Sequence, residues 1–144
     1  MKSIIKLFLF FHLLLFSNIS FAQDVTVEML NKQGDEVMVY SKKIIRINVG
    51  EKVLWKSTDP GHNVEFIPGG VPEGISDFRS NMSKDAEYKF DKPGIYAYQC
   101  TPHKVMGMIG FVVVGNDKSN LEAIKKIKYM GLSKKVASQL IPQL

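Results

Sequence analysis

One short segment of the sequence holds three side chains that commonly bind soft metal ions. Residues 100–108 (CTPHKVMGM) place a thiol, an imidazole and a thioether in the spacing C-x2-H-x4-M. A second histidine follows the turn at residues 59–61. Two imidazoles and one thiolate, with a weak axial thioether, are the ligands of a blue-copper electron-transfer site. The sequence therefore predicts one copper site, formed by His62, Cys100, His103 and Met108.

Other interpretations of these side chains were weighed against copper. Zinc also accepts cysteine and histidine, but it does not favour methionine. The segment 100–108 has no carboxylate that would suit a harder ion. Taken singly, a histidine is more often a surface residue, and a cysteine or methionine is more often a core residue. The combination and spacing of the four residues favour a metal site.

Composition limits the size and location of the protein. A chain of 144 residues predicts one domain. Its first 22 residues have two lysines, then the ten-residue run 7–16, which is apolar apart from His12, then small residues before a possible cleavage point. This is the pattern of a secretory signal peptide. The run is shorter than the roughly 20 residues that span a bilayer. We expect a signal peptide at 1–22, a domain at 23–144, export to the periplasm and no membrane anchor.

The predicted domain keeps very few reactive side chains. Residues 23–144 contain two histidines and one cysteine, with 17 Lys+Arg and 14 Asp+Glu, a net charge of +3. One cysteine cannot form an internal disulfide, although the export route leads to an oxidising compartment. The thiol of Cys100 is therefore either buried and inert or bound to a metal.

Short β-type runs dominate residues 24–115 and are separated by turn residues about every eight to twelve positions. Residues 85–90 alternate most clearly, with apolar side chains on one face and charged side chains on the other. Residues 109–114 are apolar enough for a strand buried on both faces, whereas residues 68–83 are rich in glycine and proline. The pattern predicts an all-β sandwich or barrel, with 68–83 as a surface connection.

The last 26 residues change to a helical period. Ser119 and Glu122 match a capping box, Gly131 is expected to end this first helix, and Ser133 is expected to cap a second one. Basic amphipathic helices can lie on a membrane surface. We favour the alternative that the apolar stripe docks on the sandwich while the lysines face water.

Four parts of the sequence resemble the pseudoazurins, which are single-domain members of the cupredoxin family. These parts are the segment CTPHKVMGM, the upstream GHNVE, the opening EMLNK and the tail of two helices. The resemblance covers nearly all of residues 23–144. It implies an eight-stranded Greek-key β-sandwich with two short C-terminal α-helices and one type 1 copper. It also implies the ligand roles of His62, Cys100, His103 and Met108.

Three further residues are expected to support the ligands. Asn63 can hydrogen-bond across to the loop after Cys100 and so tune the sulfur, or it can be an ordinary polar loop residue. Pro102 removes a backbone donor near the thiolate, which would raise the reduction potential, or it only forms a turn. By resemblance, Met38 packs against the imidazole of His103, and core packing is the alternative.

A metal with four protein ligands has no vacant position for a substrate. The sequence also shows no Ser/His/Asp set and no paired-carboxylate pocket outside this segment. We therefore expect an electron carrier and not an enzyme, monomeric and active through transient complexes, with no nucleic-acid partner. A periplasmic copper chaperone or storage protein is the alternative.

The edge of His103 is the expected route for electrons. The residues expected to form a small apolar surface around it are Pro60, Gly61, Pro102 and Met106. The lysines expected to surround that surface and steer an acidic partner are Lys32, Lys56 and Lys104. The sequence has Pro60 and Gln99 where pseudoazurin-like proteins typically have lysines. By resemblance, the partners are a periplasmic reductase, such as copper nitrite reductase, and a cytochrome as electron source.

Overall fold

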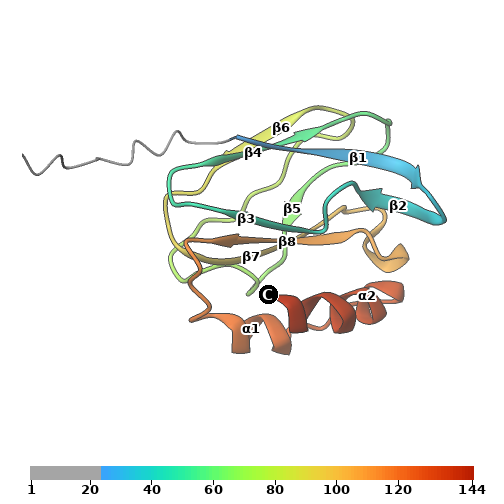
Figure 1. Cartoon of the computed structure of the whole chain (residues 1–144). Helices are drawn as coiled ribbons and strands as arrows, with labels where there is room; N and C mark the ends of the chain where they lie inside the picture. The colour runs from blue at the N-terminus through green and yellow to red at the C-terminus, as the bar shows by residue number, and fades with distance from the viewer. Residues whose placement is uncertain (1–23) are drawn as a thin grey trace, which may run out of the picture.

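The computed structural model describes residues 24–144, and the predicted signal peptide at 1–22 lies outside the described residues. The described chain forms two four-stranded sheets packed face to face, with helices against the outer face of one sheet (Figure 1). The strands are β1 (Val25–Gln33), β2 (Glu36–Tyr40), β3 (Ile44–Ile47), β4 (Lys52–Lys56), β5 (Glu65–Phe66), β6 (Ala86–Lys89), β7 (Gly94–Gln99) and β8 (Ile109–Val114). The helices are α1 (Leu121–Lys126) and α2 (Leu132–Leu140), with short 3-10 turns η1 (Lys104–Met106) and η2 (Ile141–Gln143).

The chain passes back and forth between the two sheets. One sheet has the order β2-β1-β4-β6 and the other has the order β3-β8-β7-β5. The pairs β1–β4 and β3–β8 are parallel, and the other neighbouring pairs are antiparallel. From β2 to β7 each strand lies in the opposite sheet to the strand before it, whereas β1 pairs with β2 and β7 pairs with β8 within one sheet. These crossings close the two layers over a common core. The predicted all-β sandwich is confirmed.

Aromatic side chains fill the core between the sheets. Tyr98 of β7 meets Tyr40 edge-on, with ring centroids 4.9 Å apart, and it meets Trp55 in the same way at 5.3 Å. All three are buried, and each such aromatic pair stabilises the fold by about 0.5–1.5 kcal/mol beyond its buried area. Cys100 and Met108 belong to the same cluster. Two candidate ligands, Cys100 and Met108, are therefore packed within the aromatic core of the sandwich.

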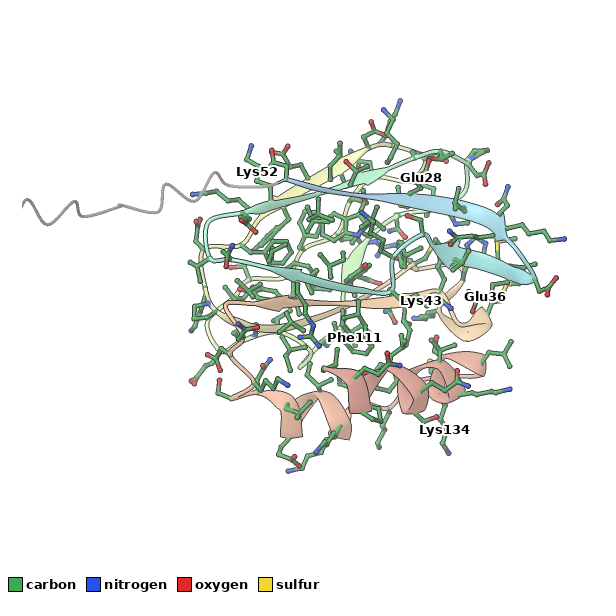
Figure 2. All side chains as sticks on the ribbon, in the orientation of Figure 1. Glu28, Glu36, Lys43, Lys52, Phe111 and Lys134 are labelled. Carbon is green, nitrogen blue, oxygen red and sulfur yellow. The ribbon has the colours of Figure 1, made fainter. Side chains whose placement is uncertain are left out.

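A second core joins the outer face of one sheet to the helices. Every residue of β8 is buried, as its apolar sequence predicts for a strand covered on both faces. Phe111 points from β8 toward the helices (Figure 2). It packs in one cluster with Ile124 of α1 and Ala137 of α2. The expected docking of the apolar stripe on the sandwich is confirmed.

The predicted capping box at Ser119 and Glu122 is wrong. The cap position is Asn120, and its side chain makes no capping bond within the helix. Its amide instead pairs with the backbone of Ile95, accepting from the N–H at 2.9 Å and donating to the carbonyl at 2.8 Å. Asn120 thus fastens α1 to β7, and this tertiary contact replaces the local cap.

The predicted boundary between the helices also changes. The helix α1 ends at Lys126, and Gly131 is the residue before α2, with φ 54°. Ser133 lies inside α2, where its hydroxyl donates to the carbonyl of Lys104. Ser133 is therefore a buried contact between helix and loop instead of a cap. No helix in the described region is long and apolar enough to span a membrane.

Candidate metal centre

Two loops at one end of the sandwich carry the candidate ligands. His62 lies between β4 and β5, and residues 100–108 connect β7 to β8. Pairing of β5 with β7, at Glu65 and Gln99, brings the first loop beside the second. Pairing of Gln99 with Ile109 closes the second loop at its base. Sheet register therefore brings residues about forty positions apart to one point.

Three donor atoms converge at this point. The Nδ1 atoms of His62 and His103 are 3.1 Å apart. The Sγ atom of Cys100 is 3.4 Å from Nδ1 of His103 and 3.8 Å from Nδ1 of His62. His62 and Cys100 are buried, and His103 is partly exposed. The group lies at the surface end of the core, with one imidazole reaching solvent.

Met108 closes the loop that carries two of these donors. Its carbonyl accepts from the N–H of Cys100 at 3.0 Å, and its own N–H donates to the carbonyl of His103 at 3.4 Å. The side chain is fully buried in the same cluster as Cys100. The structure therefore places the thioether inside the protein at the base of the loop, and its role as the axial ligand remains a prediction.

Asn31 contacts the ring nitrogen of His62 that faces away from the other donor atoms. Asn31 was not identified from the sequence as a residue of the site. Its Oδ1 lies 3.0 Å from Nε2 of His62. Because an amide oxygen only accepts, Nε2 carries the proton and Nδ1 presents its lone pair to a metal. The backbone N–H of Asn31 donates to a carboxylate oxygen of Asp59 at 2.6 Å. The one sequence signal that could have pointed to Asn31 was its position in the segment EMLNK, which resembles the pseudoazurins.

Burial sets the protonation states of the donors. Desolvation lowers the pKa of His62, and the neighbouring His103 lowers it further. Desolvation also lowers the pKa of His103. Both imidazoles are therefore neutral near pH 7, which is the form that binds metals. Burial raises the pKa of the Cys100 thiol, and hydrogen bonds from the backbone of Asn63 and His103 oppose that rise.

Asn63 ties the two ligand loops together as predicted. Its Nδ2 donates to Oγ1 of Thr101 at 2.9 Å, and its Oδ1 accepts from the N–H of Thr101 at 2.8 Å. The hydroxyl of Thr101 donates in turn to Glu65 at 3.1 Å. Tuning of the sulfur by Asn63 remains a prediction, but the cross-link itself is present.

The other two predicted supporting residues have different surroundings. Pro102 is exposed in the loop after Cys100, and its effect on the reduction potential stays a prediction. Met38 is partly buried against the cluster that holds Cys100, with a left-handed φ of 50°. Packing of Met38 against His103 also stays a prediction.

The three predicted lysines come from separate elements and differ in availability. Lys32 belongs to β1, Lys56 ends β4, and Lys104 begins η1. Lys56 pairs with the carboxylate of Asp85 at 3.0 Å, which offsets its charge. Met106 follows in η1 and is 39% exposed, as an apolar contact surface requires. The three lysines therefore offer less unpaired positive charge to a partner than the sequence suggests, because Lys56 is in an ion pair.

The donor set fits copper in its chemistry. Soft sulfur and neutral imidazole suit both oxidation states of copper, and no carboxylate belongs to the described group of His62, Cys100 and His103. Residues 27–115 match the family model for copper-binding proteins of the plastocyanin/azurin family. The chain belongs to this family.

Within the family, the chain is similar to pseudoazurins. It is 38% identical to the pseudoazurin of Methylorubrum extorquens over 123 residues, which cover 85% of this chain and 83% of that protein. It is 39% identical to the pseudoazurin of Paracoccus pantotrophus over 108 residues, 75% of this chain and 74% of that protein. The resemblance found from the sequence motifs is confirmed.

Solved structures give the same result for the fold. The crystal structure of pseudoazurin from Methylobacterium extorquens AM1 superposes with a TM-score of 0.81 at 38% identity, covering 84% of this chain and 98% of that one. The cupredoxin sandwich that the resemblance implied is confirmed. These relatives and the donor set identify the chain as a copper electron-transfer protein with a type 1 centre.

Proposed function

We propose that the protein is a periplasmic electron carrier in which His62, Cys100, His103 and Met108 hold one type 1 copper. The observation that carries this proposal is the convergence of two imidazole nitrogens and one thiol sulfur within 4.8 Å of one another. When bound, copper supplies the one-electron couple Cu(II)/Cu(I). The periplasmic location rests on the signal-peptide pattern of residues 1–22.

The surrounding residues keep the donors in one arrangement. Asn31 orients His62, the Asn63–Thr101 bonds join the two loops, and backbone bonds fix Cys100. A ligand set that is held in this way changes little when one electron is added or removed. The barrier to electron transfer is therefore low.

The same arrangement argues for a carrier and against an independent enzyme. Both histidines of residues 23–144 serve as ligands in this proposal, so neither is available as a general base. Four protein ligands leave no position for a substrate on the metal. The partly exposed edge of His103 is the route by which electrons enter and leave.

Absorption spectroscopy with two ligand variants tests the site. Adding Cu(II) should produce an intense visible band that a reductant removes. Cys100→Ser should abolish the band, because the thiolate is its source, whereas Met108→Gln should keep copper with a changed spectrum and potential, because the axial ligand is weak. Met82→Gln, at an exposed methionine, is the matched control and should change neither.

Two outcomes would contradict the proposal. Persistence of the colour in Cys100→Ser would show that the ligand assignment is wrong. A colourless copper adduct that passes its metal quickly to a chelator would favour the alternative, a copper chaperone or store. Burial of His62 and Cys100 argues against such rapid exchange.

For the partners, we propose a periplasmic reductase, such as copper nitrite reductase, and a cytochrome as electron source. Similarity to pseudoazurins and the net positive charge of residues 23–144 support this choice. The rate of electron transfer to a purified copper nitrite reductase should saturate with concentration and fall as salt is added. A rate that is independent of salt would contradict a charge-steered complex.

A further inference from the structure

Glu65 holds the two residues that flank Cys100 in the chain. It lies in β5, beside the end of β7. One carboxylate oxygen, Oε2, accepts a hydrogen bond from Nε2 of Gln99 at 3.2 Å and another from Oγ1 of Thr101 at 3.1 Å. Gln99 precedes Cys100, and Thr101 follows it. A single oxygen therefore fixes the side chains on both sides of the thiol that is proposed to bind copper.

Backbone pairing on two sides places this carboxylate. Glu65 pairs with Gln99 in the ladder between β5 and β7. On its other side it forms an isolated antiparallel bridge with Arg79. The backbone of the next residue, Phe66, donates to the carbonyl of Phe78 at 2.9 Å. The position of Glu65 is therefore set by strand pairing and not by the loop that its side chain contacts.

The negative charge of Glu65 is only weakly compensated. Its two hydrogen-bond donors, an amide and a hydroxyl, are neutral. Among the described residues its ion pair is with Arg79, whose Nη1 lies 3.8 Å from Oε1. The side chain of Arg79 is 60% exposed, so water screens much of this attraction. The side chain of Glu65 is 23% exposed, and its own charge is therefore screened less on the side that faces the protein.

The field of this carboxylate reaches the sulfur of Cys100. Burial raises the pKa of the Cys100 thiol, and the negative charge of Glu65 raises it further. Within the described chain, the donor atoms that converge belong to His62, Cys100 and His103, and Glu65 is not among them. Its influence on a bound metal is therefore exerted through charge and through the position of the loop.

We propose that Glu65 is a positioning residue that lowers the reduction potential of the bound copper. It holds Gln99 and Thr101 on either side of Cys100, and it places one negative charge near the sulfur. The identity of the metal rests on the proposed function. Because Cu(II) carries one more positive charge than Cu(I), a nearby carboxylate stabilises the oxidised form and makes reduction less favourable.

Reduction potentials of two variants at one position separate charge from hydrogen bonding. Glu65→Gln removes the charge but keeps an oxygen that can accept from Gln99 and Thr101. Its potential should rise, so that the equilibrium constant for reduction by a fixed couple increases about three- to tenfold. Glu65→Asp keeps the charge but is too short to keep both hydrogen bonds, and it should change this constant by less than about twofold.

Two further variants test the sign and the range of the effect. Arg79→Gln removes the cation that partly offsets Glu65 and should lower the potential. Asp91→Asn is the matched control, because it changes the net charge by the same amount as Glu65→Gln. Asp91 lies in the turn before β7, at the opposite end of that strand from Cys100, and pairs with Lys89 at 2.8 Å. The control should leave the equilibrium constant nearly unchanged.

Amide exchange in the Cu(I) protein, measured by nuclear magnetic resonance, tests the positioning role. Glu65→Ala removes both hydrogen bonds and should speed exchange in residues 100–103. Glu65→Gln should leave exchange there unchanged, because its amide oxygen replaces the carboxylate oxygen. Unchanged exchange in Glu65→Ala would overturn the positioning role.

The other outcomes decide the role of the charge. An equal rise in potential for Glu65→Gln and Asp91→Asn would mean that only net charge matters, which would overturn the proposal. A shift in Glu65→Asp as large as that in Glu65→Gln, or a rise in Arg79→Gln, would assign the effect to loosened structure and would overturn it too. The blue colour should persist in every variant, and its absence in the unaltered protein would instead refute the proposed function.

Discussion

The imidazole of His62, which lies in the loop between β4 and β5, is oriented by the side-chain amide of Asn31 on β1. Asn31 accepts from Nε2, and Asp59 accepts from the backbone of Asn31. This chain of two hydrogen bonds selects the tautomer of His62 and fixes the direction of its lone pair. The precision of the site at the residue scale therefore depends on β1 as well as on the two ligand loops.

Replacing Asn31 should weaken metal binding without removing any proposed ligand. Asn31→Ala should lower Cu(I) affinity by about tenfold or more, because the orientation of His62 is then lost. Asn31→Asp keeps an acceptor and should restore most of the affinity. Competition with a Cu(I) chelator measures the affinity, and the nitrogen shifts of His62 report its tautomer. Equal affinities for the two variants would contradict the orienting role.

The ligands were predictable from the sequence because their residue types are scarce. One cysteine and two histidines in residues 23–144, with two of them in a nine-residue segment, leave few alternatives. Asn31 was not predictable in the same way, because asparagine is common and nothing in its spacing relates it to His62. Only the packing of β1 beside the loop after β4 brings the two together.

The loop of residues 100–108 and the start of α2 pack so closely that two glycines at the contact have no room for a side chain. A Cβ atom at Gly131 would collide with the carbonyl oxygen of Val105, and one at Gly107, with φ 100°, would press on Val136. Ser133 adds a hydrogen bond from α2 to the carbonyl of Lys104. At the scale of elements, α2 acts as a support that limits the movement of the turn η1.

Loss of the Ser133 hydroxyl should loosen this support. Ser133→Ala leaves the partly buried carbonyl of Lys104 without the hydroxyl that donates to it, and should lower the free energy of unfolding by about 1 kcal/mol. Amide exchange in residues 104–108 should become faster. Ser138→Ala is the control on the same helix, because Ser138 is exposed and bonds only to the carbonyl of Lys135.

The control should cost less than about 0.5 kcal/mol and leave exchange in the loop unchanged. If the two variants have the same effect, α2 does not restrain the loop. Unfolding in guanidinium gives the free energies, and exchange measured by nuclear magnetic resonance gives the loop dynamics.

Strands and helices were predicted with different success for physical reasons. The strands β6 and β8 show clear alternation and a continuous apolar run, and both signals are local to the sequence. The predicted cap of α2 was wrong because Ser133 bonds to the carbonyl of Lys104. The predicted cap of α1, Ser119, was wrong because the cap position is Asn120, whose side chain bonds to β7. A local pattern cannot reveal that a polar side chain has a better partner far along the chain.

Tyrosine burial is a property of the whole sandwich. Burial raises the pKa of all five tyrosines above the usual value. The hydroxyls of Tyr40, Tyr96, Tyr98 and Tyr129 also donate to backbone carbonyls, which only the neutral phenol can do. The folded protein therefore retains phenol protons that the unfolded chain releases above a pH of about 10.

Stability should be unaffected by these groups below pH 10 and should fall as the pH rises above it. The sign follows because the unfolded chain binds fewer protons than the folded chain in that range. Ultraviolet absorption of phenolate should stay low until the protein unfolds, and Tyr96→Phe should make the loss of stability less steep. Phenolate absorption that rises near pH 10 in the folded state would contradict the prediction.

The burial of Cys100 also bears on the life of the protein before it acquires copper. Disulfide exchange and oxidation proceed through the thiolate, and they require access to the sulfur. Cys100 is fully buried, and its raised pKa keeps the thiol protonated. The folded protein can therefore remain in an oxidising compartment without forming disulfide-linked dimers or sulfenic acid, and its single cysteine stays chemically intact until the metal arrives.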